Sequence, residues 1–138
     1  PRQNAEGSLA AIIPATVRRI QEGEKPVVEG DGEQTRDFIY VEDTVRGLIL
    51  AYEREEARGK IINLGYGKEI SINRILKGIC DYMKYEGEWE HRPARKSDVR
   101  NLCACSKLAE EILGFKPQVR FDEGVLKTLD WYKGNCAK

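Results

Sequence analysis

The feature that most constrains this fold is the run from Gly30 to Asp43, which reads GDGEQTRDFIYVED. Two glycines flank an aspartate at its start, and glycine adopts positive φ at little cost, so a tight turn is predicted there. The β-branched and aromatic segment 38–41 is typical of a strand. Asp43 can then cap a helix, whose apolar residues fall at helical spacing: Val45, Leu48, Ile49 and Tyr52. The pattern places Arg36 at the mouth of a strand, where a rigid backbone can direct its guanidinium group into a cleft.

The rest of the chain alternates helical and extended patterns, which predicts an α/β fold of helices packed on short strands. The second predicted helix extends from Asp43 to about Glu56. Further helices are expected over about residues 13–22, 71–83, 106–113 and from 122 onward. Further strands are expected over 25–29, 61–64 and 88–92. Because no repeat, low-complexity segment or linker interrupts the pattern, residues 1–138 are predicted to form one domain.

Charge and composition exclude several classes of function. The 23 basic residues balance 23 acidic residues, so no net field draws the chain to nucleic acid or to a membrane surface. The hydrophobic content of 41% suits a globular protein, and no apolar run is long enough to span a bilayer. We see no secretory signal and therefore expect a cytoplasmic location.

The four cysteines, Cys80, Cys103, Cys105 and Cys136, lack both the dense spacing of secreted proteins and a paired C-x-x-C array. A metal site formed by Cys103, Cys105 and His91 is one interpretation. Zinc usually draws on C-x-x-C spacing, so we favour reduced, mostly buried thiols and expect no metal. The charged surroundings of His91 favour a solvated surface group.

Five motifs in chain order resemble the extended short-chain dehydrogenase/reductase family, which comprises NAD-dependent nucleotide-sugar epimerases and dehydratases. The most specific is the GDG-x-x-x-RD-aromatic segment between Gly30 and Asp43. Residues 1–3 are similar to the end of the family's Tyr-Gly-Pro-Arg-Gln segment, and residues 62–65 to its late strand. The segments 95–99 and 106–117 then match the family's R-x-x-D and Ser-Lys patterns. The resemblance implies the small mixed substrate-binding domain of a Rossmann-type enzyme.

By the same resemblance, Arg36 and Arg95 clamp the diphosphate of a nucleotide sugar and Asp98 receives the ribose. Planar guanidinium groups grip phosphate oxygens in pairs and stay charged, so the residue types suit the task. The resemblance also assigns the base to the backbone around Val27 and Glu29, and the phosphates to Ala11 and Ile12.

The residues themselves leave plainer roles open. Arg36 could pair with Asp43 or another carboxylate, and an exposed pair of that kind contributes little to stability. Arg95 lies in a basic loop, and Asp98 alone could be a turn residue or a helix cap. The helix that begins near Ile12 could present free amides to an anion, could simply pack on the core, or could do both.

The resemblance implies NAD as cofactor of a full-length enzyme, but the residues needed to seat it are missing from this sequence. No G-x-x-G-x-x-G or G-x-G-x-x-G turn occurs, and no tyrosine is followed by lysine four residues later. We therefore expect residues 1–138 to be a C-terminal portion without its NAD-binding Rossmann domain. We assign no catalytic or cofactor-binding residue to it and expect no NAD bound to the fragment.

The function that we favour is nucleotide-sugar binding within an NAD-dependent UDP-sugar 4-epimerase, similar to UDP-glucose 4-epimerases. The alternatives are the substrate domain of a dTDP-sugar 4,6-dehydratase or of a UDP-glucuronate decarboxylase, and a non-catalytic binding or interaction module. We also expect the fragment to expose apolar surface meant for the absent domain, and to self-associate through it.

Overall fold

The computed structural model describes residues 1, 3, 11–95 and 98–135. These residues contain five helices, four short strands and one 3-10 turn. The helices are α1 (Ile12–Gln21), α2 (Val41–Glu53), α3 (Ile72–Met83), α4 (Lys107–Leu113) and α5 (Phe121–Asn135). The strands are β1 (Val27–Glu29), β2 (Thr35–Asp37), β3 (Glu69–Ser71) and β4 (Glu90–Arg92), and the turn η1 is Glu55–Ala57. Arg2, which belongs to the motif over residues 1–3, and Cys136 lie outside the described residues.

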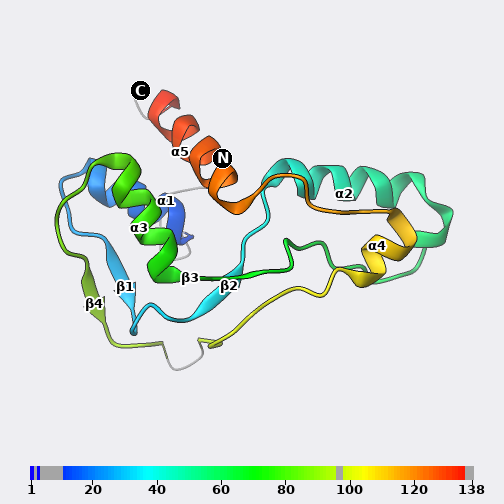
Figure 1. Ribbon diagram of the computed structural model, residues 1–138, viewed down its shortest axis with the longest axis horizontal. Coiled ribbons are helices and arrows are strands. Elements are labelled where there is room, and N and C mark those ends of the chain that lie inside the picture. The colour runs from blue at the N-terminus through cyan, green and yellow to red at the C-terminus, as the bar shows by residue number, and fades with distance from the viewer. Residues whose placement is uncertain (2, 4–10, 96–97, 136–138) are drawn as a thin grey trace.

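The molecule has a body and an arm (Figure 1). The body holds α1, α3 and α5 beside the pair β1 and β4, and the arm holds α2 and α4. Each has an apolar cluster of its own. The α/β class of helices on short strands, predicted from the sequence, is confirmed.

Two small sheets join distant parts of the chain. β1 pairs in parallel with β4, so that Val28 lies opposite His91. β2 pairs antiparallel with β3, so that Arg36 lies opposite Ile70. The second pairing runs directly into α3, because β3 ends at Ser71 and α3 begins at the next residue. It therefore fixes Arg36 to the body.

The core of the body is built around α3. Its side chains Ile72, Ile75, Leu76 and Ile79 are buried, as the apolar stripe in the sequence predicts. The hydroxyl of Ser71 accepts a hydrogen bond from the amide of Arg74 and so caps the start of α3. Helices α1 and α5 pack on the same cluster through Val17, Val125, Leu129 and Tyr132.

A buried carboxylate fastens the arm to the segment before α5. The side chain of Asp43 is 2% exposed and accepts hydrogen bonds from the amides of Gln118 and Val119, at 2.9 to 3.0 Å. Arg46 donates to the same carboxylate at 2.7 Å. The prediction of Asp43 as a helix cap is wrong: α2 begins two residues earlier, and Asp43 uses its oxygens for a distant loop instead.

The strand predicted over residues 38–41 is also wrong. The ladder with β3 ends at Asp37, and α2 starts at Val41, so the segment between them has no strand to pair with. Phe38 instead packs its ring against Phe121, with the centroids 6.1 Å apart. Arg36 therefore lies inside a strand rather than at its mouth. The strand expected over 61–64 likewise forms no ladder in the described structure.

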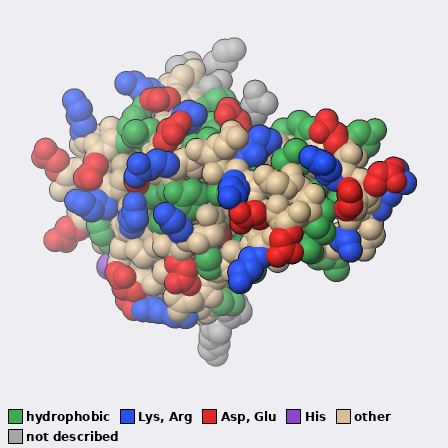
Figure 2. Space-filling view, turned by 45° about the vertical axis from the view of Figure 1, so that its right-hand side comes forward, with side chains coloured by type: hydrophobic (Ala, Val, Ile, Leu, Met, Phe, Trp, Pro, Cys, Tyr) green, Lys and Arg blue, Asp and Glu red, His purple; other side chains and the backbone are tan. Residues whose placement is uncertain are grey.

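Helix α2 presents an apolar face to solvent. Its exposed large side chains are Val41, Val45, Leu48, Ile49 and Tyr52. Tyr52 is 93% exposed, as is Ile61 in the following segment. The arm stands out from the body, and green apolar side chains lie open between charged ones on its surface (Figure 2). The expected exposed apolar surface is thus present on α2.

Candidate functional site

The seven residues predicted for the site line one cavity of about 500 Å³, which lies between α1, β1, β2 and the loop after β4. They are Ala11, Ile12, Val27, Glu29, Arg36, Arg95 and Asp98. They come from segments far apart in the sequence, and the fold brings them to a shared wall.

Helix α1 lines one side of the cavity with its N-terminus and along its length. Ala11 is the N-cap residue, and no side chain among the described residues caps the helix there. The first turn contains no acidic residue, and its third residue is proline, which has no N–H to satisfy. Free amides at the start of a helix attract anions, so this end of the cavity favours a phosphate or carboxylate.

Arg36 is held by three acceptors. Its guanidinium group donates to the carbonyl oxygens of Thr35 at 2.7 Å and Val99 at 2.6 Å, and it forms a salt bridge with the carboxylate of Asp98. The side chains of Arg36 and Asp98 are 25% and 29% exposed. A charged group with its rotamer fixed in this way is preorganised to receive an anion. The possible pairing of Arg36 with Asp43 does not occur, because Asp43 pairs with Arg46.

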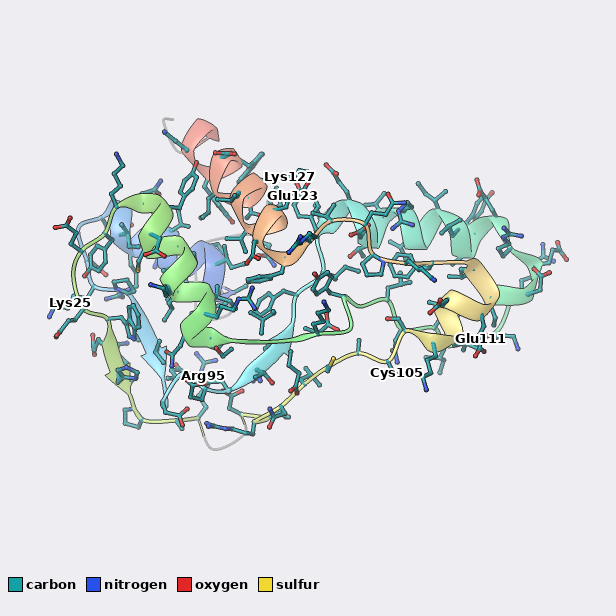
Figure 3. All side chains as sticks on the ribbon, in the orientation of Figure 1. Lys25, Arg95, Cys105, Glu111, Glu123 and Lys127 are labelled. Carbon is teal, nitrogen blue, oxygen red and sulfur yellow. The ribbon has the colours of Figure 1, made fainter. Side chains whose placement is uncertain are left out.

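Arg95 forms the second charged pair. It donates to the carboxylate of Glu29 at 2.7 Å and forms a salt bridge with it. Figure 3 labels Arg95 beside the end of β1, where Glu29 is the last residue. The side chain of Arg95 is 63% exposed, so water screens this pair and it holds Arg95 less firmly than Arg36 is held.

The turn with two glycines positions the loop that carries Arg95 and Asp98. Gly30 and Gly32 both have positive φ, as predicted, and a Cβ on Gly32 would lie 2.0 Å from the side chain of Asn73. The amide of Gly30 donates to the carbonyl of Arg92 at 2.8 Å. Arg100 donates to Asp31 at 2.7 Å, and this hydrogen bond lowers the pKa of the Asp31 carboxyl. The loop is thereby tied to the turn at both ends.

Charge in the cavity is strongly one-sided. Its described lining holds four guanidinium groups against two carboxylates, although the chain as a whole is neutral. The arginines are Arg18, Arg19, Arg36 and Arg95, and the acids are Glu29 and Asp98. The excess positive charge is opposite in sign and similar in size to the negative charge of a diphosphate.

Sequence reasoning missed several lining residues: Ala15, Thr16, Arg18, Arg19, Gln34, Phe38 and Ile72. Gln34 is 8% exposed and donates to the carbonyl oxygen of Glu29 at 2.7 Å, which braces the end of β1. Ile12, Ala15, Thr16 and Arg19 share one helical face, so the spacing from Ile12 was a signal that could have found them.

A second cavity of about 310 Å³ adjoins the first and shares Ala11, Ile12 and Phe38 with it. Its lining comes from α2, α5 and the segment before α2, and Arg120 is its one charged residue among those described. The two cavities thus differ in character, because one is rich in charge and the other is mostly apolar. An elongated ligand with a charged centre could occupy both.

The three described cysteines differ in their exposure. Cys80 is buried, but Cys103 and Cys105 are exposed, so the expectation of mostly buried thiols holds for one of the three described. His91 is exposed, as predicted, and its Nδ1 lies 2.8 Å from the carbonyl oxygen of Gly30. Within the described ranges no three metal-binding side chains come close enough to hold an ion.

Comparisons with known proteins place this fold and cavity in a family. The sequence profile of the GDP-mannose 4,6 dehydratase family matches residues 1–128. A putative UDP-glucose 4-epimerase of Methanocaldococcus jannaschii is 32% identical over 134 residues, which cover 97% of this chain and 42% of that protein. Other relatives include decarboxylases and dehydratases of nucleotide sugars.

Solved structures agree with the sequence comparison. The UDP-glucose 4-epimerase of Thermotoga maritima, solved with UDP-glucose, superposes with a TM-score of 0.91 at 32% identity, covering 99% of this chain and 43% of that one. MoeE5, solved with UDP-glucuronic acid and NAD, superposes with a TM-score of 0.86 at 29% identity, covering 97% and 44%.

The fold, the cavity and these likenesses define a nucleotide-sugar type of extended short-chain dehydrogenase/reductase. The chain belongs to the family of NAD-dependent nucleotide-sugar epimerases and dehydratases, and it corresponds to their C-terminal portion. It spans about two fifths of the length of the relatives it matches.

Proposed function

We propose that this chain binds the nucleoside diphosphate part of a UDP-sugar for an NAD-dependent 4-epimerase. The observation that carries the proposal is the meeting of Arg36, Arg95 and Asp98 in one cavity with excess positive charge. Relatives that are epimerases, including one solved with UDP-glucose, support this choice of substrate.

The two salt bridges in the cavity involve the same side chains that we expect to contact the ligand. In our proposal the diphosphate lies between the N-terminus of α1 and the two guanidinium groups, where its oxygens compete with Glu29 for Arg95. Arg36 keeps its carbonyl partners and offers its remaining donors. Asp98 then accepts a hydrogen bond from a ribose hydroxyl, and Val27 and Glu29 border the base.

The chain supplies binding energy rather than reacting groups. Anchoring of the nucleotide, which does not react, holds the sugar near the chemistry and lets its ring turn while the diphosphate stays fixed. NAD would accept and return a hydride when bound to the rest of a full-length enzyme. The described residues of this cavity contain no glycine-rich turn at a helix start that would seat it.

Two alternative functions would use the same site. A dTDP-sugar 4,6-dehydratase or a UDP-glucuronate decarboxylase would use the same diphosphate clamp, and relatives of both general kinds are 30% to 32% identical. A non-catalytic module that only binds nucleotide sugars would use it as well. The anchoring step is common to all of them, so it is the step to test first.

Calorimetric titration of the chain with UDP tests the proposal. We expect weak binding to the wild type and at least tenfold weaker binding to Arg36→Ala, because a charge-assisted clamp on phosphate is lost. Arg58→Ala is the control, since Arg58 directly follows η1, is 78% exposed and pairs with Glu55 outside the cavity. Equal heats for Arg36→Ala and the wild type would contradict the anchor role.

The partners of the chain follow from its surface. No helix in the described ranges could cross a membrane. In our proposal the apolar face of α2 meets the NAD-binding part of the enzyme, and two copies of the isolated chain associate through it. We propose no contact with nucleic acid. The three described cysteines are free thiols, which supports our proposal of a cytoplasmic location.

A further inference from the structure

A further cavity, of about 510 Å³, shares Arg36 with the charged cavity of Arg95 and Asp98, and it is lined by two exposed free thiols. The thiols belong to Cys103 and Cys105, which the proposed function does not use. Among the described residues no third His, Cys, Asp or Glu completes a metal-binding group with them. The pair therefore offers the chemistry of a dithiol rather than that of a metal site.

The pattern of exposure places both thiols on one face of the chain. Residues 101–106 form neither helix nor strand, and exposure alternates along them. Cys103 and Cys105 are exposed, whereas Ala104 and Ser106 are partly buried. A period of two is that of an extended chain, in which residues two apart point to the same side. The two sulfur atoms therefore face the same cavity as neighbours.

The backbone between the two cysteines is tied to a carboxylate of β2. The amide of Ala104 donates to Oδ2 of Asp37 at 3.2 Å, and Sγ of Cys103 lies 3.8 Å from the same oxygen. The carboxylate also accepts hydrogen bonds from the amides of Tyr66 and Gly67, at 2.7 and 2.8 Å. A movement of Ala104 therefore acts on a hydrogen-bond network that joins three segments.

A disulfide between the two cysteines is nearly within reach. Two residues of extended chain separate their Cα atoms by at most about 7 Å. Disulfides usually join residues whose Cα atoms are about 4.4 to 6.8 Å apart. Closure therefore needs only a small contraction of the chain at Ala104. Because the amide of Ala104 is bonded to Asp37, this contraction changes that hydrogen bond.

We propose that Cys103 and Cys105 are a modification site, a dithiol that closes to an internal disulfide by exchange with a small disulfide such as glutathione disulfide. The Cys105 thiolate attacks one sulfur of glutathione disulfide, whose S–S bond breaks and releases one glutathione thiolate. The Cys103 thiolate then attacks the sulfur of Cys105 and releases the second. The protein loses two protons and two electrons, and glutathione disulfide is reduced to two molecules of glutathione.

Cys103 suits the second step of this exchange. Partial desolvation raises the pKa of its thiol, and the negative charges of Asp37 and Glu69 raise it further. Its thiol is therefore mostly protonated at neutral pH, and it reacts once the mixed disulfide on Cys105 holds the target sulfur beside it. Reducing conditions keep such exposed pairs as thiols, so we expect the disulfide only under oxidising conditions.

Oxidation of the chain in buffers of increasing glutathione disulfide tests the inference. The remaining thiols are labelled with N-ethylmaleimide in denaturant, and the chain is then cut with trypsin. Both cysteines fall on the peptide 101–107, and Cys80 falls on the peptide 78–84, because trypsin cuts after lysine and arginine. We expect the first peptide to lose both labels together and to weigh two hydrogen atoms less than its reduced, unlabelled form. The peptide with the buried Cys80 should keep its label.

The matched variants are Cys103→Ser and Cys105→Ser, which should give no internal disulfide and at most a glutathione adduct on the remaining thiol. Peptide 101–107 that keeps both labels in every buffer, or that carries glutathione on both cysteines, would overturn the proposal. A bond between two chains would overturn it as well. This inference does not depend on nucleotide binding, so a failure of UDP to bind leaves it standing.

Two-dimensional NMR of the oxidised and reduced chain tests the link to Asp37. On oxidation we expect the amide signals of Ala104, Tyr66 and Gly67 to shift. The same treatment of the double variant Cys103→Ser with Cys105→Ser should leave these signals in place, and its spectrum also shows that it is folded. Unmoved amide signals in a fully oxidised wild type would overturn the predicted contraction at Ala104.

Discussion

Arg36 and Asp98 form a salt bridge across 62 residues of sequence, and both side chains face the charged cavity. The pairing depends on two separate constructions. The ladder between β2 and β3 fixes Arg36, and the turn from Gly30 to Gly32 holds the loop that brings Asp98 to it. A guanidinium group and a carboxylate held side by side can serve a phosphate and a sugar hydroxyl of one ligand.

Neutralising Asp98 should weaken the binding of a ligand that contains ribose more than the binding of pyrophosphate. In Asp98→Asn we expect the affinity for UDP relative to pyrophosphate to fall about tenfold. The ribose of UDP loses its carboxylate acceptor, whereas pyrophosphate has no ribose and is not affected in this way. Calorimetric titration with both ligands gives this ratio. Asp81→Asn is the matched control, since Asp81 pairs with Lys77 outside the cavity and its neutralisation should leave the ratio unchanged. The same ratio in Asp98→Asn and the wild type would argue against ribose binding by Asp98.

Asp43 should make the fold sensitive to acid. Burial alone would raise the pKa of its carboxyl, but the hydrogen bonds from Arg46, Val119 and Gln118 outweigh burial and lower the pKa. A lowered pKa in the folded state means that the ionised form stabilises the fold above the ordinary value near 3.9. We expect this stabilisation to be complete at neutral pH and to be lost as the pH falls below about 4.

The comparison of Asp43→Asn with the wild type isolates this effect. At pH 7 we expect the free energy of unfolding to fall by about 3 kcal/mol, because Arg46 and two backbone amides lose the charge of a buried acceptor. Urea denaturation at pH 7 and pH 3 measures the difference, which should be smaller at pH 3. A difference that is independent of pH would show that the charge of Asp43 does not stabilise the fold.

The exposed face of α2 should drive self-association of the isolated chain. Sedimentation at increasing concentration should show dimers or larger species, since apolar side chains on one helical face are left open to water. Leu48→Glu combined with Ile49→Glu should restore the monomer. Leu126→Glu on α5 is the control, because Leu126 is 49% exposed but lies outside this face. A wild-type chain that stays monomeric at high concentration would refute the prediction.

The sequence grouped the residues that line the charged cavity better than it predicted some of the strands. Arg36, Arg95 and Asp98 carry a recognisable spacing, and Ile72 to Ile79 carry a helical stripe that burial then follows. The apolar run 38–41 looked like a strand, but strand formation needs a partner ladder, and β3 offers only three residues before α3 begins. Short-range patterns contain no information about where such a partner ends.

The role of Asp43 shows a second limit. Asp43 has the position of a helix cap in the sequence, whereas its partners Gln118 and Val119 lie 75 and 76 residues away. Contacts between distant segments decide this role, and no local pattern encodes it.

The most direct test of nucleotide anchoring is to map the binding of UDP on ¹⁵N-labelled protein by two-dimensional NMR. We predict that the shifted amides cluster at the start of α1, in β1 and β2, and around Arg95 and Asp98, and that the cluster disappears in Arg36→Ala. Shifts that are absent, or that gather on α2 and α4 while this cavity stays silent, would contradict the account.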